Sequence, residues 1–492
     1  MSYAGPSVDA EGRRSASTGR GPSPSQFGSL PQIPPAAIVV TAILAAVVCG
    51  RFFADGHTKY AAALVLIAVY GPLVFFDLPA AFALWTAVLY IKDIRALSVG
   101  PNAMGVLVGL GFIGIFVTRV RTLPVFRQQR RLIIGTALLV LWLTLSIAWA
   151  PAPGVAATEA GYWWLGALAF LIVMTTPTSP RAIGLIALAF VIGATLAAVI
   201  GLASGGLSTA TDSVGQTTQT VVNGRLTGGG GDPNVQAAGF IAAMFLAMGL
   251  YNVYRRRAAR IGLIAAFMLI TVAFFATESR GGLLALGVST IAALVLFPDQ
   301  RRRILGFVMV GVVIAGIATA AQPGSLSRIT DFGGGTSGRS DIWAVAVKVF
   351  EQHPLVGVGL DNFQVVEPRY ALLHRTVTRV QYITGSTPYR VHNTYLQVLA
   401  ENGIIGLVAY LAFLIASLRA ALLAARLLES MGYRSYAYLA RSSMMGTLGF
   451  LTAIFFFSDG DDWRIWILLG LGPALLALAR NLPSRTGVEL LH

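Results

Sequence analysis

The most regular feature of the sequence is a series of apolar runs separated by short polar segments. A helix needs about 20 mainly apolar residues to cross the hydrocarbon core of a bilayer. Two of the runs, 59–76 and 79–92, are short enough to form a tight re-entrant pair, so the pattern predicts about 12 to 14 spans. The predicted spans are 35–53, 59–76, 79–92, 101–118, 132–150, 161–176, 182–203, 233–253, 261–277, 280–297, 304–321, 403–425, 437–457 and 463–480.

These runs predict an all-α, polytopic bundle of transmembrane helices. Ser, Gly, Pro and Arg dominate residues 1–33, which predicts a disordered tail. The first apolar run begins too far into the chain for an ordinary signal peptide, so we expect it to be retained as a span. The expected organisation is a cytoplasmic tail at 1–33, membrane helices at 34–321 with an outer loop at 204–232, a long extracytoplasmic loop with short amphipathic helices at 322–402, membrane helices at 403–482, and a cytoplasmic tail at 483–492.

Composition agrees with a membrane protein. The chain is 55% hydrophobic and 12% charged, whereas soluble domains are about 25% charged. The net charge of +15 would suggest nucleic acid as a partner of a soluble protein. Here the arginines gather in alternate loops, at 119–131, 255–260, 301–303 and 426–434. Positive loops remain on the inner side, so we expect no nucleic-acid partner and a location in the cytoplasmic membrane with both termini inside.

Four predicted helices begin on the outer side with polar residues. These starts contain Asp232-Pro233-Asn234, Glu278-Ser279-Arg280-Gly281-Gly282, His392-Asn393 with Glu401 just over two turns later, and Asp461-Asp462-Trp463. The first N–H groups of a helix are unpaired and carry partial positive charge, which favours anions. Arg225, Arg280 and Arg339 lie near them, and arginine suits bidentate phosphate contacts. The pattern therefore predicts a diphosphate site, although Arg225 alone fits an interfacial anchor equally well.

His392 is the candidate general base, because a neutral imidazole can take a proton from a hydroxyl group. No pair of histidines has metal-ligand spacing, so no metal or other cofactor is expected. After Arg339, the apolar positions between Ile342 and Phe350 have helical spacing, and Pro354 ends the pattern. This amphipathic helix is expected either to lie on the outer leaflet or to cap the bundle.

These motifs resemble the O-antigen ligase and O-antigen polymerase superfamily over roughly residues 220–425. The resemblance rests on Arg225 with Gly231-Asp232-Pro233-Asn234, Ser279-Arg280-Gly281-Gly282, Gly338-Arg339-Ser340-Asp341-Ile342-Trp343, His353-Pro354-Leu355-Val356-Gly357-Val358-Gly359, His392-Asn393-Thr394-Tyr395-Leu396 and Glu401-Asn402-Gly403. Membership would imply a metal-independent, inverting glycosyltransferase. Such an enzyme moves a glycan from undecaprenyl diphosphate to a hydroxyl of a glycan, lipid or protein acceptor outside the inner membrane.

By motif position, the resemblance assigns the diphosphate to Arg280 and Arg339 and the role of general base to His392. Arg225 would assist in diphosphate binding, with Asp232, Asn234, Asn393 and Glu401 as supporting residues. Arg369, Arg375, Arg379 and Arg390 are further candidates for holding the donor. Ligase and polymerase remain open. A transporter of a solute or lipid-linked sugar would instead require ionisable residues within the spans, where almost none are expected. A structural scaffold would tolerate substitution of the outer arginines and histidine.

Overall fold

The computed structural model describes residues 51, 58–91, 99–119, 124–177, 179–203, 225–228, 231–321, 339–373 and 389–483. The predictions for the tail 1–33, the span 35–53, Arg375, Arg379 and the last residues of the C-terminal tail lie outside these ranges. The chain divides into two compact units, Met1–Ala61 and Ala62–His492. The description below concerns the second unit.

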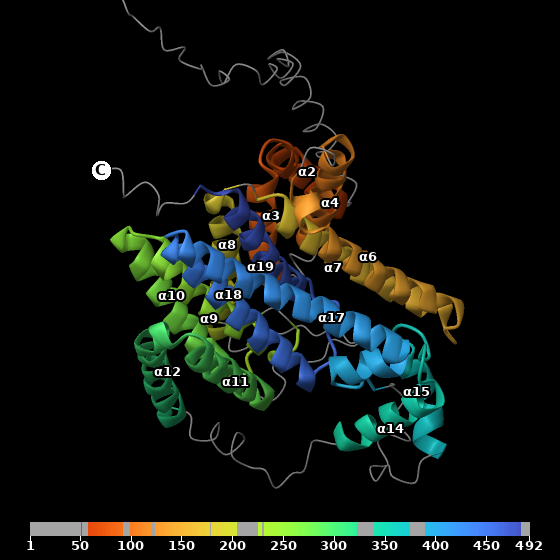
Figure 1. Cartoon of the computed structure of the whole chain (residues 1–492). Coiled ribbons are helices and arrows are strands. Elements are labelled where there is room, and N and C mark those ends of the chain that lie inside the picture. Colours follow the sequence, from red (N-terminus) through yellow and green to blue (C-terminus); the bar gives the residue numbers. More distant parts are fainter. Residues whose placement is uncertain are drawn as a thin grey trace, which may run out of the picture. The chain divides into compact units, whose positions relative to one another are not determined.

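Helices alone make up the regular structure of the described residues. They are α2 (Thr58–Phe76), α3 (Leu78–Val88), α4 (Val99–Arg119), α5 (Pro124–Gln128), α6 (Arg130–Leu145), α7 (Pro153–Thr175), α8 (Pro180–Ala203), α9 (Pro233–Val253), α10 (Arg257–Ala276), α11 (Arg280–Leu296), α12 (Arg301–Ala321), α14 (Arg339–Gln352), α15 (Phe363–Leu373), α17 (Thr394–Ser430), α18 (Arg434–Ala453) and α19 (Trp463–Asn481), with 3₁₀ turns η2 (Leu89–Ile91), η4 (Ser146–Ala148), η5 (Pro298–Gln300) and η6 (Ile454–Phe456) (Figure 1).

Among the described residues, 8 helices are long and apolar enough to cross a membrane, which confirms the all-α, polytopic bundle. They are α6 with η4, α7, α8, α9, α10, α17, α18 with η6, and α19. The helices α11 and α12 pass the same test as a pair that is bent by 107° at Pro298. The apolar stretches Leu64–Phe76, Leu78–Ile91 and Ala103–Thr118 are shorter. The first two coincide with the short runs in the sequence, and the third falls on the predicted span 101–118.

The helix starts predicted from polar residues are present, and each is closed by a side-chain cap. The carboxylate of Asp232 accepts a hydrogen bond from the N–H of Asn234 at 2.6 Å, and Pro233 occupies the first helical position of α9. Ser279 caps α11 through the N–H of Gly282 at 3.1 Å. Asn393 caps α17 and Asp462 caps α19 in the same way. Such caps satisfy N–H groups that the helix itself leaves unpaired.

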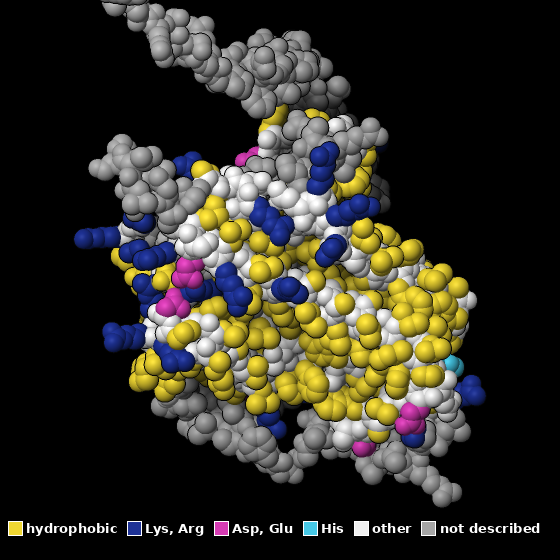
Figure 2. All heavy atoms as spheres, in the orientation of Figure 1, with side chains coloured by type: hydrophobic (Ala, Val, Ile, Leu, Met, Phe, Trp, Pro, Cys, Tyr) yellow, Lys and Arg dark blue, Asp and Glu magenta, His cyan; other side chains and the backbone are white. Residues whose placement is uncertain are grey.

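The interior of the bundle is formed by α9, α18 and α19, the most completely buried of the membrane-spanning helices. Helix α9 packs against α8, α10, α11 and α18. Small residues allow this close packing, since Gly446 of α18 lies directly against the backbone of Ala242. By contrast, α6, α10 and α17 leave much of their apolar surface exposed, as expected for helices that face lipid. In Figure 2, hydrophobic side chains cover α6 and α17, whereas basic side chains gather where α10 and α18 begin.

Helices α14 and α15 form a small cap beside the beginning of α17. Ile342, Val345, Ala346 and Val349 of α14 are buried, as the spacing predicted, and they pack with residues of α15 and α17. The amphipathic helix therefore caps the bundle. Helix α15 was not predicted from the sequence, because Pro368 lies within it.

A break in α17 separates its first turns from its membrane-spanning part. At Gly403, the backbone adopts φ 65° and ψ −170°. A second glycine with positive φ, Gly357, lies against the same break, and the N–H of Ile404 donates to the carbonyl of Pro354 at 2.9 Å. A Cβ atom on Gly357 would collide with the carbonyl of Glu401, and one on Gly403 would collide with that of Leu355. Both positions require glycine because two backbones cross without side chains between them.

Candidate functional site

Arg225 joins the beginning of α9 to the turn between α10 and α11. Its Nε donates to the carbonyl of Thr277 at 2.8 Å, and its Nη2 donates to Oδ1 of Asn234 at 3.1 Å. The hydroxyl of Ser279 donates to the same oxygen at 2.8 Å. These specific contacts differ from those of an interfacial anchor, since they tie the beginning of α9 to the α10–α11 turn.

Arg280 occupies the first position of α11, directly after the cap Ser279, and its side chain is exposed. The two glycines that follow allow close packing on either side. A Cβ atom on Gly281 would lie 2.8 Å from the ring of Phe456, and one on Gly282 would lie 3.0 Å from Cβ of Ala237. The Ser-Arg-Gly-Gly sequence thus places a guanidinium group at a helix start that touches both η6 and α9.

His392 lies directly before the cap of α17 in a left-handed backbone conformation, with φ 54°. Burial lowers the pKa of its imidazole, and the positive charges of Arg339 and Arg390 lower it further, while the carboxylate of Asp232 raises it. The net direction is downward. His392 is therefore neutral at pH 7, and its charged neighbours come from the starts of α9 and α14.

Neighbouring elements hold the His392 segment in place. The indole N–H of Trp343 in α14 donates to the carbonyl of Val391 at 3.1 Å. On the other side, the N–H and hydroxyl of Thr394 both donate to the carbonyl of Phe457, at 3.1 and 2.9 Å. Among the described non-glycine residues, those with positive φ are Glu278, Asp361 and His392, and they lie two residues before α11, α15 and α17 respectively. Backbone of this kind costs about 1–3 kcal/mol per residue and is common at functional sites.

Aromatic rings connect the start of α11 with the starts of α14 and α17. Phe455 lies 5.6 Å from Trp343 and 6.4 Å from Tyr395, measured between ring centroids. Phe455 also lies 5.3 Å from Phe456, the residue against which Gly281 packs. Turn η6 therefore lies between the helix end that carries Arg280 and the ends that carry Arg339 and His392.

A second polar region surrounds Arg390, two residues before His392. The carboxylates of Asp361, Asp461, Glu159 and Asp459 raise the pKa of its guanidinium group. Glu159, Asp459 and Asp461 border a small cavity of about 20 Å³ that also reaches Thr394 and Gln397. The sequence analysis named Asp461 and Asp462 only as part of a helix start and did not select Glu159, Asp361 or Asp459. The polar Asp361-Asn362 pair after Gly359 was the available signal.

Glu401 belongs to this second region rather than to the region around Arg225 and Arg280. Its Oε2 accepts a hydrogen bond from the N–H of Asp361 at 2.9 Å, and its Oε1 accepts one from Gln397 at 3.0 Å. It therefore holds the loop that crosses α17 at Gly403. Of the predicted site residues, Arg225, Asp232 and Asn234 come together beside Ser279-Arg280. The charges of Arg339 and Asp232 shift the pKa of His392. Asn393 is buried and serves as the cap of α17.

The expectation that the spans hold almost no buried charge needs correction at two positions. Arg441 in α18 pairs with Asp299 at 2.6 Å and with Glu429. Arg464 in α19 pairs with Asp462 in a fully buried contact. Within the described residues, no group of His, Cys, Asp and Glu side chains is arranged to hold a metal ion.

The helical bundle and its polar helix ends define a multi-pass membrane protein with arginine and histidine side chains at one candidate site. Residues 265–411 match the family model of the O-antigen ligase, which confirms the resemblance seen in the sequence. The matched region contains Arg280, Arg339 and His392, whereas Arg225, Asp232 and Asn234 precede it. The match supports an O-antigen ligase-like enzyme of the glycan ligase or polymerase class. No curated protein matches the chain.

Proposed function

We propose that this protein transfers glycan from an undecaprenyl-diphosphate carrier to an acceptor hydroxyl at the outer face of the cytoplasmic membrane. The observation that carries the proposal is the imidazole of His392, whose pKa is lowered by burial and by Arg339. An imidazole that is neutral at pH 7 can act as a general base. An arginine beside it supplies the charge that a diphosphate requires.

The reaction proceeds as a single displacement. The imidazole of His392 takes the proton of the acceptor hydroxyl while its oxygen bonds to the anomeric carbon of the donor glycan. The bond between this carbon and the diphosphate oxygen breaks, and the electron pair leaves with the diphosphate. Arg280 and Arg339 balance the charge that develops there, which is the main role of preorganised donors in such sites. Attack opposite to the leaving group inverts the anomeric configuration, and guanidinium groups rather than a metal ion stabilise the leaving group.

Arg225 supports the site by holding α9 against the α10–α11 turn. Its contacts with Asn234 and Thr277 keep the start of α9 beside Arg280. This start carries the partial positive charge of a helix N-terminus. The diphosphate therefore meets two guanidinium groups and a helix end, held in place before the substrate arrives.

The distribution of charge supports the outer location. Arginines gather at the opposite helix ends, as in Arg255–Arg257 before α10 and Arg301–Arg303 at the beginning of α12. Positive loops stay in the cytoplasm, which favours an outer position for the starts of α9, α11, α17 and α19. Both chain termini would then lie inside.

Transfer by purified protein is the direct test. Protein in proteoliposomes is incubated with an undecaprenyl-diphosphate glycan and candidate acceptors, and product is measured by mass spectrometry. His392→Ala is expected to reduce transfer by about 10²-fold or more while the protein stays in the membrane. Arg280→Lys and Arg339→Lys keep the charge but lose bidentate geometry, so transfer should fall with both. Arg302→Lys, at the opposite helix end, is the matched control. Normal transfer by the His392→Ala protein would refute the proposal.

Ligase and polymerase activities differ in their product. Loss of a ligase leaves complete chains unattached to their acceptor, whereas loss of a polymerase leaves single repeats. Glycan profiling of a deletion strain separates the two. The buried arginines Arg441 and Arg464 are the feature expected of a transporter, but both are paired with carboxylates. Solute flux that depends on Arg280, without transfer, would favour that alternative.

A further inference from the structure

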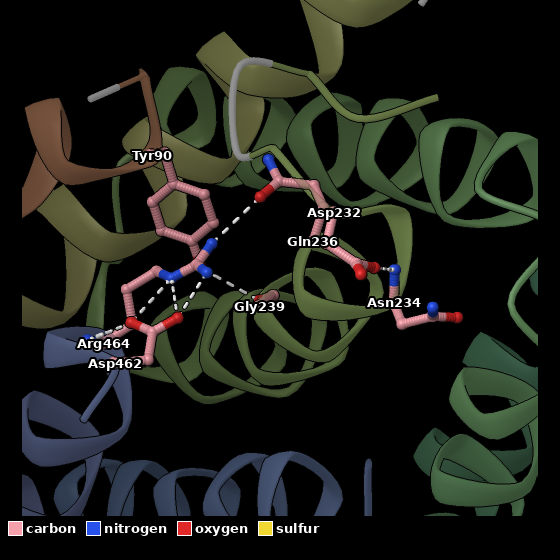
Figure 3. A network of polar contacts seen from close by, with 7 residues as sticks. All are labelled: Tyr90, Asp232, Asn234, Gln236, Gly239, Asp462 and Arg464. Carbon is pink, nitrogen blue, oxygen red and sulfur yellow. Dashed lines mark hydrogen bonds and ion pairs between the residues drawn. The ribbon is translucent and has the colours of Figure 1, made fainter. Parts of the chain in front are cut away.

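Arg464 is buried at the beginning of α19 in a network that joins three elements. Its side chain and that of Asp462 are 4% and 3% exposed. The Nε of Arg464 donates to both carboxylate oxygens of Asp462, at 3.0 and 2.9 Å, and its Nη1 donates to Oε1 of Gln236 in α9 at 2.9 Å. Its guanidinium carbon lies 5.2 Å from the centre of the Tyr90 ring. Figure 3 shows the guanidinium group between these three side chains.

This network is more than is needed to pack the helices. Removing an ion pair from water costs several kcal/mol per ion, and apolar residues of similar size often give equal or greater stability. Ionisable residues inside a membrane protein therefore suggest a functional role. The Arg464 network reaches the beginning of α9 through Gln236, which indicates what that role is.

Gln236 lies one turn after Asp232, whose carbonyl accepts the N–H of Gln236 at 3.0 Å. The Tyr90 hydroxyl donates to the carbonyl of Gly239, in the following turn, at 3.0 Å. Asn234 points away from this network (Figure 3), toward Arg225 and Ser279. The beginning of α9 is thus held by Arg464 and Tyr90 on one side and by Arg225 and Ser279 on the other. Its cap Asp232 carries the carboxylate that raises the pKa of His392.

We propose that Arg464 is a positioning residue which, through Gln236, fixes the beginning of α9 and so sets the place of Asp232 relative to His392. Its consequence for transfer rests on the proposed function, but the positioning itself does not. The charged groups that act on the imidazole are Arg339 of α14, Arg390 of the preceding segment and Asp232 of α9. Asp232 alone favours the protonated form, so its displacement makes His392 harder to protonate.

The test measures protonation of His392 directly. Full-length protein in detergent micelles is treated with diethyl pyrocarbonate, which reacts with neutral imidazole, and the rate at His392 is followed by peptide mass spectrometry from pH 4 to pH 8. In Gln236→Met and Arg464→Lys, the midpoint is expected to fall by about 0.3 pH unit, the shift that Coulomb's law gives when two charges about 8 Å apart move about 2 Å further apart at an effective dielectric constant near 20. Gln236→Met removes the link without removing a charge, and it serves if Arg464→Lys does not fold.

Arg441→Lys is the matched control, because Arg441 is also a buried arginine paired with carboxylates but contacts Asp299 and Glu429 instead of Gln236. It is expected to lower thermal stability and leave the midpoint at His392 unchanged. An unchanged midpoint in folded Gln236→Met protein overturns the positioning role, as does an equal shift in Arg441→Lys. Absence of transfer by the wild-type protein would instead count against the proposed function, because the midpoint does not depend on it.

Discussion

Trp343 donates its indole hydrogen bond to the carbonyl of Val391, the residue directly before His392. This contact ties α14, which begins at Arg339, to the segment that presents the candidate base. The distance between the guanidinium group of Arg339 and the imidazole of His392 therefore depends on one side-chain hydrogen bond, which a single substitution can remove.

Trp343→Phe should therefore weaken transfer without unfolding the protein. The phenyl ring keeps the packing against Phe455, but the carbonyl of Val391 loses its donor, which costs about 1 kcal/mol. We expect a small fall in thermal stability and a clearly larger fall in kcat, measured by product formation in proteoliposomes. Val347→Ala, at an exposed position of α14, is the control. Equal kcat for Trp343→Phe and wild type would show that this contact does not set the site.

Transfer should depend on pH through His392. A base must be unprotonated, and the pKa of His392 lies below its usual value of 6.5. At pH 6.5 activity should consequently exceed half of its maximum, and it should fall further as the pH drops through the lowered pKa. The acidic limb of kcat/KM, followed from pH 4 to pH 8, measures this, because kcat/KM reports the pKa of the free enzyme. A limb centred above pH 6.5 would contradict the assignment.

His392→Asn tests the same base with less strain on the backbone. Asparagine tolerates the left-handed conformation better than most residues, so the φ of 54° should persist. We expect a thermal stability near that of the wild type and transfer lower by about 10²-fold or more. Comparison with His392→Ala separates loss of the base from loss of backbone geometry. Appreciable transfer by the Asn variant would argue for another base.

Gly403→Ala should destabilise the protein strongly. The new Cβ would meet the carbonyl of Leu355, and a left-handed φ costs an L residue about 1–3 kcal/mol in addition. Gly287→Ala is the control, because Gly287 lies within α11 with nothing within 4 Å of the new atom, and alanine favours helix there by up to about 1 kcal/mol. Thermal unfolding in detergent should show a large loss for the first variant and none for the second.

Glu367 should make stability depend on pH. Burial raises the pKa of this α15 carboxyl to about 7, against 4.5 as its usual value. Between these values, the folded protein holds a proton that the unfolded chain releases, so this group's contribution to stability declines as the pH rises from about 4.5 through about 7. Glu367→Gln cannot titrate. The difference in melting temperature between variant and wild type should grow in favour of the variant across this interval, and a constant difference would exclude the effect.

Sequence patterns predicted the helices well where apolar residues are continuous. The predicted span 233–253 coincides with α9. Helix α7 begins at Pro153 instead of 161, because its first turns carry polar residues such as Glu159, which bonds to Trp163 at 3.2 Å. Helix α17 begins at Thr394, before its predicted span, because the break at Gly403 leaves its first turns outside the apolar run. Hydropathy therefore identifies the apolar part of a helix, and it does not identify the polar turns by which the helix extends beyond that part.

The candidate site was predictable where it depends on local signals. Caps and arginines at helix starts are local, and they identified Arg225, Arg280, Arg339 and His392. The pairing of Glu401 with the N–H of Asp361 depends on how a loop crosses a helix. The contact between Arg464 and Gln236 depends on which helices are neighbours. Neither relationship is encoded in the spacing along one segment.

The crossing of Gly357 and Gly403 restricts how the region around α14 and α15 can diverge among such proteins. One backbone lies directly on the other. The number of residues between Pro354 and Asp361 is therefore fixed by the contacts that this stretch makes with α17 at Glu401 and Gly403. An inserted or deleted residue there would put a side chain where only a hydrogen atom fits. Variation in chain length among proteins built on this plan should therefore fall before α14 or after α15, and engineered epitopes or fusion partners belong there as well.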